Sequence, residues 1–259
     1  MWSKLVVLII PLFLSCDQVK KFDSYIQNEE KVNRYTNDNP YRNVVDIPLP
    51  VGYSRVAYPA GSFSSWLRNI ALKKDKRVFK FDGTLKVNQE AQFAVVDISV
   101  GDKDLQQCAD AVMRLRAEYF YSLHQYSRIH FIDNNGRVYQ FTQPYTRQAF
   151  NKYLELVFSM CGSASLEKQL SKHIVLPQVI PGDVLIHGGF PGHAEIVMDV
   201  ATNKDGKIIY LLAQSYMPAQ DIHILKNPTS FLSPWYQVSE DLDITTPEYT
   251  FSVNALKRW

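Results

Sequence analysis

A histidine, a glutamine and a cysteine supply the side chains from which a site for acyl transfer can be built. His193 follows a loop rich in Gly and Pro, residues 188–192, and opens a segment that alternates as a β-strand does. Its imidazole can act as a general base, because the pKa of a histidine ordinarily lies near neutral pH. Gln214 ends the next predicted strand, where its side-chain amide can orient the imidazole. Cys108, upstream of both, is the candidate nucleophile.

The position of Gln214 relative to His193 depends on how the two predicted strands pair. If a loop over residues 202–205 closes the hairpin, Gln214 lies directly opposite His193 on the same face. Alternation places His193 and Glu195 on the more polar face, which a ligand can reach. The core face then consists of the alternating apolar residues Ala194, Ile196, Met198 and Val200. A slip of one residue would move Gln214 to the wrong face, and the sequence leaves that register open.

The activation of Cys108 depends on where its helix begins, and the sequence supports two interpretations. A helix is predicted over residues 104–121 with Asp102 as its cap, which places Cys108 more than a turn inside it on an apolar stripe. The thiol is then a small buried hydrophobe without chemistry. If the helix begins at Cys108 instead, the positive end of the helix dipole favours the thiolate. In that case Gln106 or Gln107 is available for an oxyanion hole.

The second cysteine of the expected domain, Cys161, is predicted at a helix C-terminus, where the helix dipole disfavours a thiolate. We therefore expect it to be structural. Cys108 and Cys161 are far apart and outside any C-x-x-C pattern, so they either form one disulfide or act separately.

Two simpler interpretations use the same histidine. A metal site would be formed by two histidines that flank the loop and two carboxylates on the second strand, namely His187, His193, Glu195 and Asp199. Their spacing matches no diagnostic ligand pattern, so we predict no metal and no cofactor. Alternatively, His193 is a hydrogen-bonded residue of a hairpin that has no catalytic role.

The N-terminal residues predict export and lipid attachment. Lys4 supplies a positive charge, residues 5–14 are almost wholly apolar, and Ser15 precedes Cys16. This pattern is typical of a secretory signal, and the apolar run is too short to span a membrane. Residues 13–16 (FLSC) resemble a bacterial lipobox, which implies a lipid on Cys16 and anchorage of the exported protein in the bacterial cell envelope. A plain cleaved signal peptide is the alternative.

The composition predicts one folded domain behind a polar tether. Of the 259 residues, 46% are hydrophobic and 21% charged, which is typical of a globular protein. The net charge of +2 gives no electrostatic footprint for nucleic acid, so we expect no nucleic-acid partner. We assign residues 1–16 to the signal, the polar residues 17–45 to a tether and residues 46–259 to a single α+β domain.

The periodicity of the domain predicts helices that mostly precede an antiparallel sheet. Helices are expected over residues 63–70, 104–121, 146–161 and 166–171. Strands are expected over residues 77–81, 91–100, 129–132, 137–141, 194–200 and 207–214. The tail from residue 228 is expected to wrap the domain irregularly.

Four segments resemble, in matching order, the bacterial lipoprotein family called domain of unknown function 4846. They are residues 61–69 (GSFSSWLRN), 104–119 (DLQQCADAVMRLRAEY), 191–194 (PGHA) and 211–220 (LLAQSYMPAQ). The resemblance runs from about residue 50 to residue 236 and implies an envelope protein of unassigned activity. Separately, residues 181–214 resemble the part of papain-like and NlpC-type cysteine hydrolases that presents their histidine.

Two functions are therefore expected as alternatives. The first is an envelope-anchored cysteine hydrolase of papain-like or NlpC-like fold that cleaves amide bonds, as in cell-wall peptides. In it Cys108 is the nucleophile, His193 the base and Gln214 the orienting group. The second is a non-catalytic lipoprotein of the same fold that binds a glycan, a peptide or an envelope protein through exposed aromatic residues such as Tyr216 and Trp235.

Overall fold

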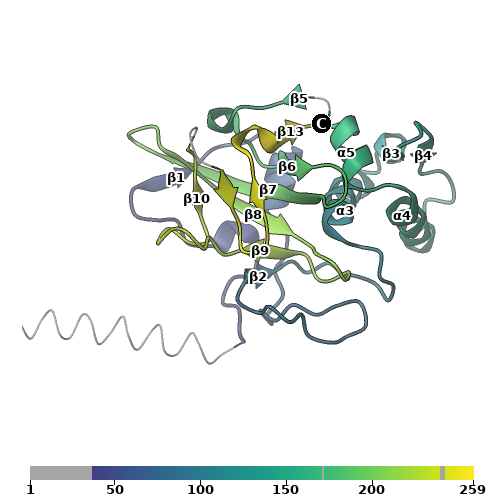
Figure 1. The fold of residues 1–259 in the computed structure, drawn as a ribbon, viewed down its shortest axis with the longest axis horizontal. Coiled ribbons are helices and arrows are strands. Elements are labelled where there is room, and N and C mark those ends of the chain that lie inside the picture. The colour runs from purple at the N-terminus through teal and green to yellow at the C-terminus, as the bar shows by residue number, and fades with distance from the viewer. Residues whose placement is uncertain (1–36, 171, 240–242) are drawn as a thin grey trace, which may run out of the picture. The chain divides into compact units, whose positions relative to one another are not determined.

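A computed structural model describes residues 37–170, 172–239 and 243–259 of the chain. The predicted signal peptide, the lipidation of Cys16 and most of the predicted tether lie outside these residues. Residues 38–259 form one unit, and its fold is α+β, as predicted, with an antiparallel sheet as the largest element (Figure 1). None of the helices in the described part of the chain is long and apolar enough to cross a membrane.

The main sheet is built around a long central hairpin. The strands of this sheet are β1 (Tyr53–Arg55), β2 (Gln92–Val95), β5 (Lys172–His173), β6 (Val184–His187), β7 (His193–Asn203), β8 (Ile208–Gln214), β9 (His223–Leu225), β10 (Tyr236–Gln237) and β13 (Leu256–Arg258). Their order is β2-β9-β8-β7-β6-β13-β5, with β1 also paired to β7 and β10 to β8. The β7–β8 hairpin therefore lies in the middle of the sheet, where neighbouring strands hold both of its edges.

Smaller elements surround this sheet. The helices are α2 (Phe63–Arg68), α3 (Cys108–Ser122), α4 (Arg147–Met160) and α5 (Ser163–Gln169), and short 3-10 helices lie at Val44–Asp46, Tyr126–Arg128, Leu176–Gln178 and Val253–Ala255. Two separate hairpins are β3 (His130–Ile132) with β4 (Val138–Gln140), and β11 (Ile244–Thr245) with β12 (Thr250–Phe251).

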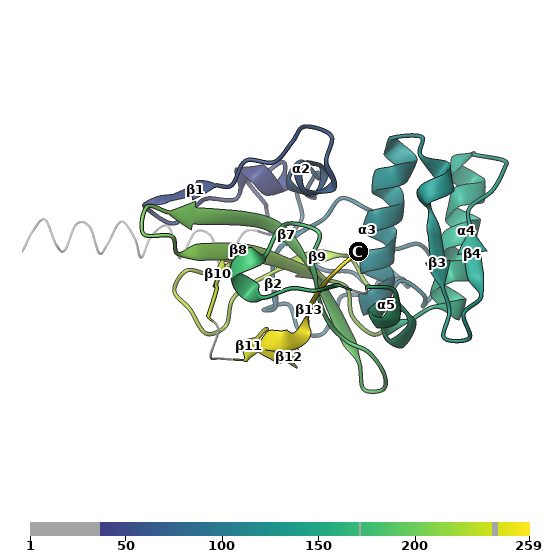
Figure 2. The ribbon, with the colours of Figure 1, turned by 90° about the horizontal axis from the view of Figure 1, so that it is seen from above.

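Both faces of the β7–β8 hairpin are buried, which differs from the prediction of one polar face. On one face Ile196 and Leu211 join the apolar core that the helices cover. On the other face Val197 and Leu212 pack in a second core with Phe251 from the C-terminal region. Figure 2 shows α2 on one side of these strands and the β11–β12 hairpin on the other. His193 therefore lies beneath a covering layer and not on an open face.

Several predicted elements are confirmed because their signals are local. Ser62 caps α2 by accepting a hydrogen bond from the backbone of Ser65, and Thr146 caps α4 in the same way from Ala149. The predicted hairpin over residues 129–141 is present as β3 and β4. The predicted helix over residues 166–171 is present at Ser163–Gln169. A local cap and a local turn are sufficient to place these elements.

Other predictions are wrong where pairing is not local. Residues 77–81 form only isolated bridges, and the strand predicted over residues 91–100 is reduced to β2. The tail is not irregular, because it supplies β10 to β13 and inserts β13 between β6 and β5. Residues 38–45 were assigned to the tether, but Val44 is fully buried in the core. The packed part of the chain therefore begins before residue 46.

Candidate active site

Cys108 is the first residue of α3, so the predicted helix over residues 104–121 with Asp102 as its cap starts too early. The N-cap is Gln107, whose backbone N–H donates to Asp110 Oδ2 at 3.0 Å. The carbonyl of Gln107 accepts the first helical hydrogen bond, from Ala111. Cys108 is partly exposed, so it is not the fully buried hydrophobe of the first interpretation. Its thiol lies where the positive end of the helix dipole favours a thiolate.

The segment before Cys108 is a loop because it is bonded to the chain between β8 and β9. Ser215 Oγ donates to the carbonyl of Gln106 at 2.9 Å, and the backbone of Ala219 donates to Asp104 Oδ1 at 2.6 Å. These contacts join residues more than a hundred positions apart, so no local pattern could reveal them. They fix the start of α3 against the end of β8.

His193 opens β7 and contacts Cys108. The thiol of Cys108 lies near enough to its imidazole to act on the pKa of His193, and the Glu195 carboxyl group lies 3.5 Å from its Nε2. Burial would by itself lower the pKa of His193, but the hydrogen bonds and charges of Cys108 and Glu195 outweigh burial and raise the pKa to about 10. The structure thus brings the predicted nucleophile and the predicted base together.

Gln214 completes the predicted trio. Its Oε1 lies 2.7 Å from His193 Nε2, and both side chains are buried. An amide oxygen only accepts, so Nε2 of the imidazole carries the hydrogen of this bond. The other ring nitrogen, Nδ1, is then the one available to Cys108.

The register that brings Gln214 to His193 is not the predicted one. In the pairing of β7 with β8, Ile196 lies opposite Ala213. The next residue of β8, Gln214, therefore lies level with Glu195 and not, as predicted, opposite His193. A bulge over residues 197–199 shifts the register by one residue. Without this bulge Gln214 would lie on the opposite face of the sheet, because side chains alternate along a strand. The bulge therefore decides that Gln214 can reach the imidazole.

Glu195 is a site residue that the sequence analysis considered only as a metal ligand. Its Oε1 lies 3.5 Å from His193 Nε2 and accepts a hydrogen bond from Thr246 Oγ1 at 2.8 Å. Its Oε2 is buried without a hydrogen-bond partner among the described residues. Burial raises the pKa of Glu195, and the hydrogen bond and charge of His193 oppose that rise. Its position two residues after His193 on one strand was a usable signal.

Two further charged residues extend the network beyond Gln214. Glu248 Oε2 accepts a hydrogen bond from Gln214 Nε2 at 2.6 Å and another from Lys86 Nζ at 2.6 Å. Lys86 is buried, and the side chain of Glu248 is 12% exposed. No local pattern in the sequence indicates either residue, because Lys86 and Glu248 come from segments outside β7 and β8.

Aromatic rings shield the imidazole. The ring of His193 lies 5.2 Å from that of Tyr216, 5.1 Å from that of Tyr249 and 5.9 Å from that of Phe251. Tyr216, predicted as an exposed aromatic residue, is thus partly buried against the site. Trp235, the other predicted surface aromatic residue, is buried in the core and donates to the carbonyl of Pro48. It is therefore not available to a ligand.

The remaining predicted residues lie apart from this trio. Cys161 is buried and free, and burial raises its pKa to about 11, so its thiol is structural and no disulfide joins it to Cys108. Asp199 accepts hydrogen bonds from Arg55 and Arg68, at 2.7 Å each. The four proposed metal ligands therefore do not converge, and the described residues contain no group of three His, Cys, Asp or Glu side chains suited to a metal ion.

Only one of the two glutamines proposed for an oxyanion hole is directed to another partner. The amide of Gln107 donates to Asp104 Oδ1 at 3.2 Å. Gln106 is buried, its Oε1 accepts from Arg114 at 3.4 Å, and its Nε2 has no hydrogen-bond partner among the described residues. The NH₂ of Gln106 and the backbone N–H groups in the first turn of α3 are therefore the candidate oxyanion donors.

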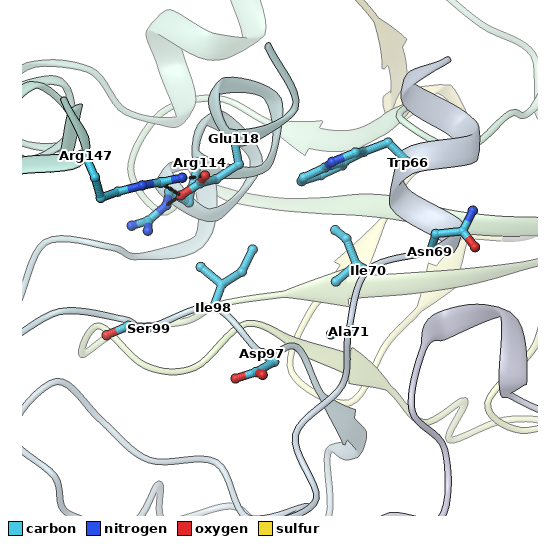
Figure 3. A pocket seen from close by; sticks show the side chains of 10 residues that line it. All are labelled: Trp66, Asn69, Ile70, Ala71, Asp97, Ile98, Ser99, Arg114, Glu118 and Arg147. Atoms are coloured by element: carbon cyan, nitrogen blue, oxygen red, sulfur yellow. Dashed lines mark hydrogen bonds and ion pairs between the residues drawn. The ribbon is translucent and has the colours of Figure 1, made fainter. Parts of the chain in front are cut away.

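A second candidate site is a cavity of about 430 Å³ between α2, α3, α4 and residues 97–99. Figure 3 shows Trp66 facing Glu118 across this cavity, above Ile70. Glu118 binds both Arg114 and Arg147, so its carboxylate is neutralised by two cations. Cys108, His193 and Gln214 are not among the residues that line this cavity, which are Trp66, Asn69, Ile70, Ala71, Asp97, Ile98, Ser99, Arg114, Glu118 and Arg147.

Comparison with known proteins identifies a family but no function. A family model described as "Domain of unknown function (4846)" matches residues 44–144 and 133–258. No curated protein and no solved structure matches the chain. The description of the matching model names no reaction, so the chemistry has to be argued from the geometry of the site.

Proposed function

We propose an activity from the geometry of the site, because the chain belongs to the family of domain of unknown function 4846, whose description names no reaction. The proposed activity is that of a cysteine hydrolase that cleaves amide bonds. One observation carries the proposal: Cys108 begins a helix and lies beside the buried base His193, whose pKa it helps to raise. A thiol and a base in contact at a helix N-terminus are the parts that an activated nucleophile requires.

The reaction begins when the thiol proton of Cys108 moves to Nδ1 of His193. Raising the pKa of His193 to about 10, against the effect of burial, favours the imidazolium at neutral pH, and Gln214 accepts from its Nε2–H. The thiolate attacks the substrate carbonyl carbon, and backbone N–H groups at the start of α3 stabilise the oxyanion. The imidazolium then protonates the departing amine as the C–N bond breaks, which leaves a thioester on Cys108. Water attacks the thioester, His193 takes its proton, and the free thiol is restored as the acid leaves.

The arrangement also supports a papain-like or NlpC-like fold, which we propose for this domain. A helix that carries the cysteine packs on an antiparallel sheet that carries the histidine and the orienting amide. We also propose that the domain is an exported lipoprotein of the bacterial cell envelope, which the signal pattern and the lipobox-like Cys16 support, and that its substrate is therefore a cell-wall peptide.

The proposal is tested by incubating the purified protein with soluble cell-wall peptides and following new amines and carboxylates by mass spectrometry. Cys108→Ser and His193→Ala should each lower the rate of amide cleavage by on the order of 10³-fold, because the pair acts as a unit. Cys161→Ser is the matched control and should cleave like the wild type. Equal rates of amide cleavage by Cys108→Ser and the wild type would show that Cys108 is not the nucleophile.

A binding protein without activity is the alternative, and the cavity lined by Trp66, Ile70 and Ile98 favours it. It predicts that the wild type cleaves no amide and that its Cys108 reacts with a thiol reagent no faster than in the unfolded chain. The reactivity of Cys108 with a thiol reagent thus distinguishes the two proposed functions without the natural ligand being identified.

A further inference from the structure

We infer that the C-terminal turn over residues 246–249 is part of the active site and that Glu248 is a positioning residue for His193. The turn joins β11 to β12 and comes from the tail that was expected to be irregular. The inference rests on the proposed function for its catalytic meaning. Its structural content, which nitrogen of His193 carries the hydrogen, can be tested without that function.

Three of the four residues of the turn contact the site. Thr246 Oγ1 donates to Glu195, which lies beside the imidazole. Glu248 accepts from the amide of Gln214, and the ring of Tyr249 lies 5.1 Å from that of His193. One short turn thus contacts the imidazole itself and two of the side chains beside it, Glu195 and Gln214.

The importance of Glu248 follows from the symmetry of an amide side chain. The oxygen and the NH₂ of Gln214 have nearly the same shape, so packing alone does not decide which of them faces His193. Only the oxygen can accept the Nε2–H hydrogen bond that leaves Nδ1 to Cys108. The NH₂ facing His193 would instead favour a hydrogen on Nδ1, which would block transfer of the thiol proton.

Two acceptors on the far side of Gln214 determine its orientation. Glu248 Oε2 lies 2.6 Å from Gln214 Nε2, and an ionised carboxylate can only accept. The second acceptor is His223 Nε2, 3.4 Å from the same nitrogen. His223 Nδ1 lies 2.8 Å from the carbonyl of Asp221 and therefore carries the hydrogen, which leaves Nε2 as an acceptor. Turning the amide over would bring its oxygen against both acceptors.

Lys86 supports Glu248 in this role. Its ammonium group donates to the same carboxylate oxygen at 2.6 Å, and its side chain is only 6% exposed. The cation holds the Glu248 carboxylate at a fixed position beside Gln214. Lys86 thus positions Glu248, Glu248 orients Gln214, and Gln214 orients His193.

The test compares two variants that differ only in the acceptor at position 248. Lys86→Met removes the buried cation from both, so neither leaves an unpaired charge. The double variant Lys86→Met with Glu248→Gln retains an acceptor oxygen at position 248. The double variant Lys86→Met with Glu248→Leu has no acceptor at that position. The rate of Cys108 alkylation by iodoacetamide at neutral pH should fall about tenfold from the Gln to the Leu variant, the effect of one lost hydrogen bond in the network.

A matched control and a second readout complete the test. The surface pair Glu90 and Lys226 is replaced by Leu and Met, which should leave the alkylation rate unchanged because this pair lies in solvent. In a Cys108→Ser background, nitrogen NMR of neutral His193 should show hydrogen on Nε2 in the Gln variant and both tautomers in the Leu variant.

Equal alkylation rates and the same tautomer in the Gln and Leu variants overturn the inference alone. Failure of the proposed function has a different signature, which is a wild-type Cys108 no more reactive than in the unfolded chain. The tautomer readout then still decides whether Glu248 orients the imidazole. If the Leu variant does not fold, Lys86→Met with Glu248→Ala takes its place in the comparison with the Gln variant, and equal alkylation rates and the same tautomer again overturn the inference.

Discussion

Cys108 and Glu195 change the proton affinity of His193. Burial by itself lowers the pKa of His193, and the partners Cys108 and Glu195 outweigh burial and raise it to about 10. A base that was merely buried would be neutral at physiological pH. The neighbouring thiol and carboxyl group, and not burial, therefore give this histidine its raised pKa.

The raised pKa of His193 predicts a specific dependence of stability on pH. The ordinary pKa of 6.5 applies in the unfolded chain, so the folded protein holds the extra proton between that value and about 10. The stabilisation is fully present below about pH 6.5 and is lost as the pH rises towards 10. The free energy of unfolding of the wild type should therefore fall relative to that of His193→Gln over this range, as measured by urea denaturation. Parallel curves for the two proteins would contradict the assignment.

The helices and strands that carry these residues are fixed partly by local contacts and partly by contacts between segments that are distant in the sequence. Caps and periodicity are local, so α2 and α4 and the β3–β4 hairpin could be predicted from the sequence. The start of α3 could not, since it depends on hydrogen bonds from the chain between β8 and β9. Contacts between distant segments also limit what could be predicted of the site. His193, Gln214 and Cys108 could be predicted from the sequence, whereas their partners Glu248 and Lys86 could not. A bulge in β7 is equally invisible, because a single extra residue leaves the apolar pattern almost unchanged.

The C-terminal strand β13 gives a prediction at this scale. Leu256 is fully buried where β13 pairs with β6, so Leu256→Ala should lower the free energy of unfolding by about 2–5 kcal/mol. Leu156 on α4 is half exposed, and Leu156→Ala should change the free energy of unfolding by less than about 0.5 kcal/mol. Denaturant titration measures both. A cost for Leu256→Ala as small as that for Leu156→Ala would mean that the tail only wraps the domain.

At the scale of the whole molecule, the site lies between the two apolar cores of one α+β unit. The helices bring Cys108 to one end of the central hairpin, and the C-terminal region covers the other face of the same strands. Elements from the middle and the end of the chain are thus needed before the trio and its supporting carboxylates can meet. The proposed acyl-transfer site therefore depends on the whole fold, and the proposed export and lipid anchor would present that site to cell-wall peptides.

The reactivity of Cys108 tests the central claim most directly. In a Cys16→Ser background the rate of alkylation by iodoacetamide is measured against pH for the folded protein, with peptide mapping to separate Cys108 from Cys161. We predict that Cys108 reacts at least about tenfold faster at neutral pH than it does in the unfolded chain. Cys161, whose pKa burial raises to about 11, serves as the internal control and should barely react. A Cys108 that reacts in the folded protein as slowly as in the unfolded chain would contradict the account.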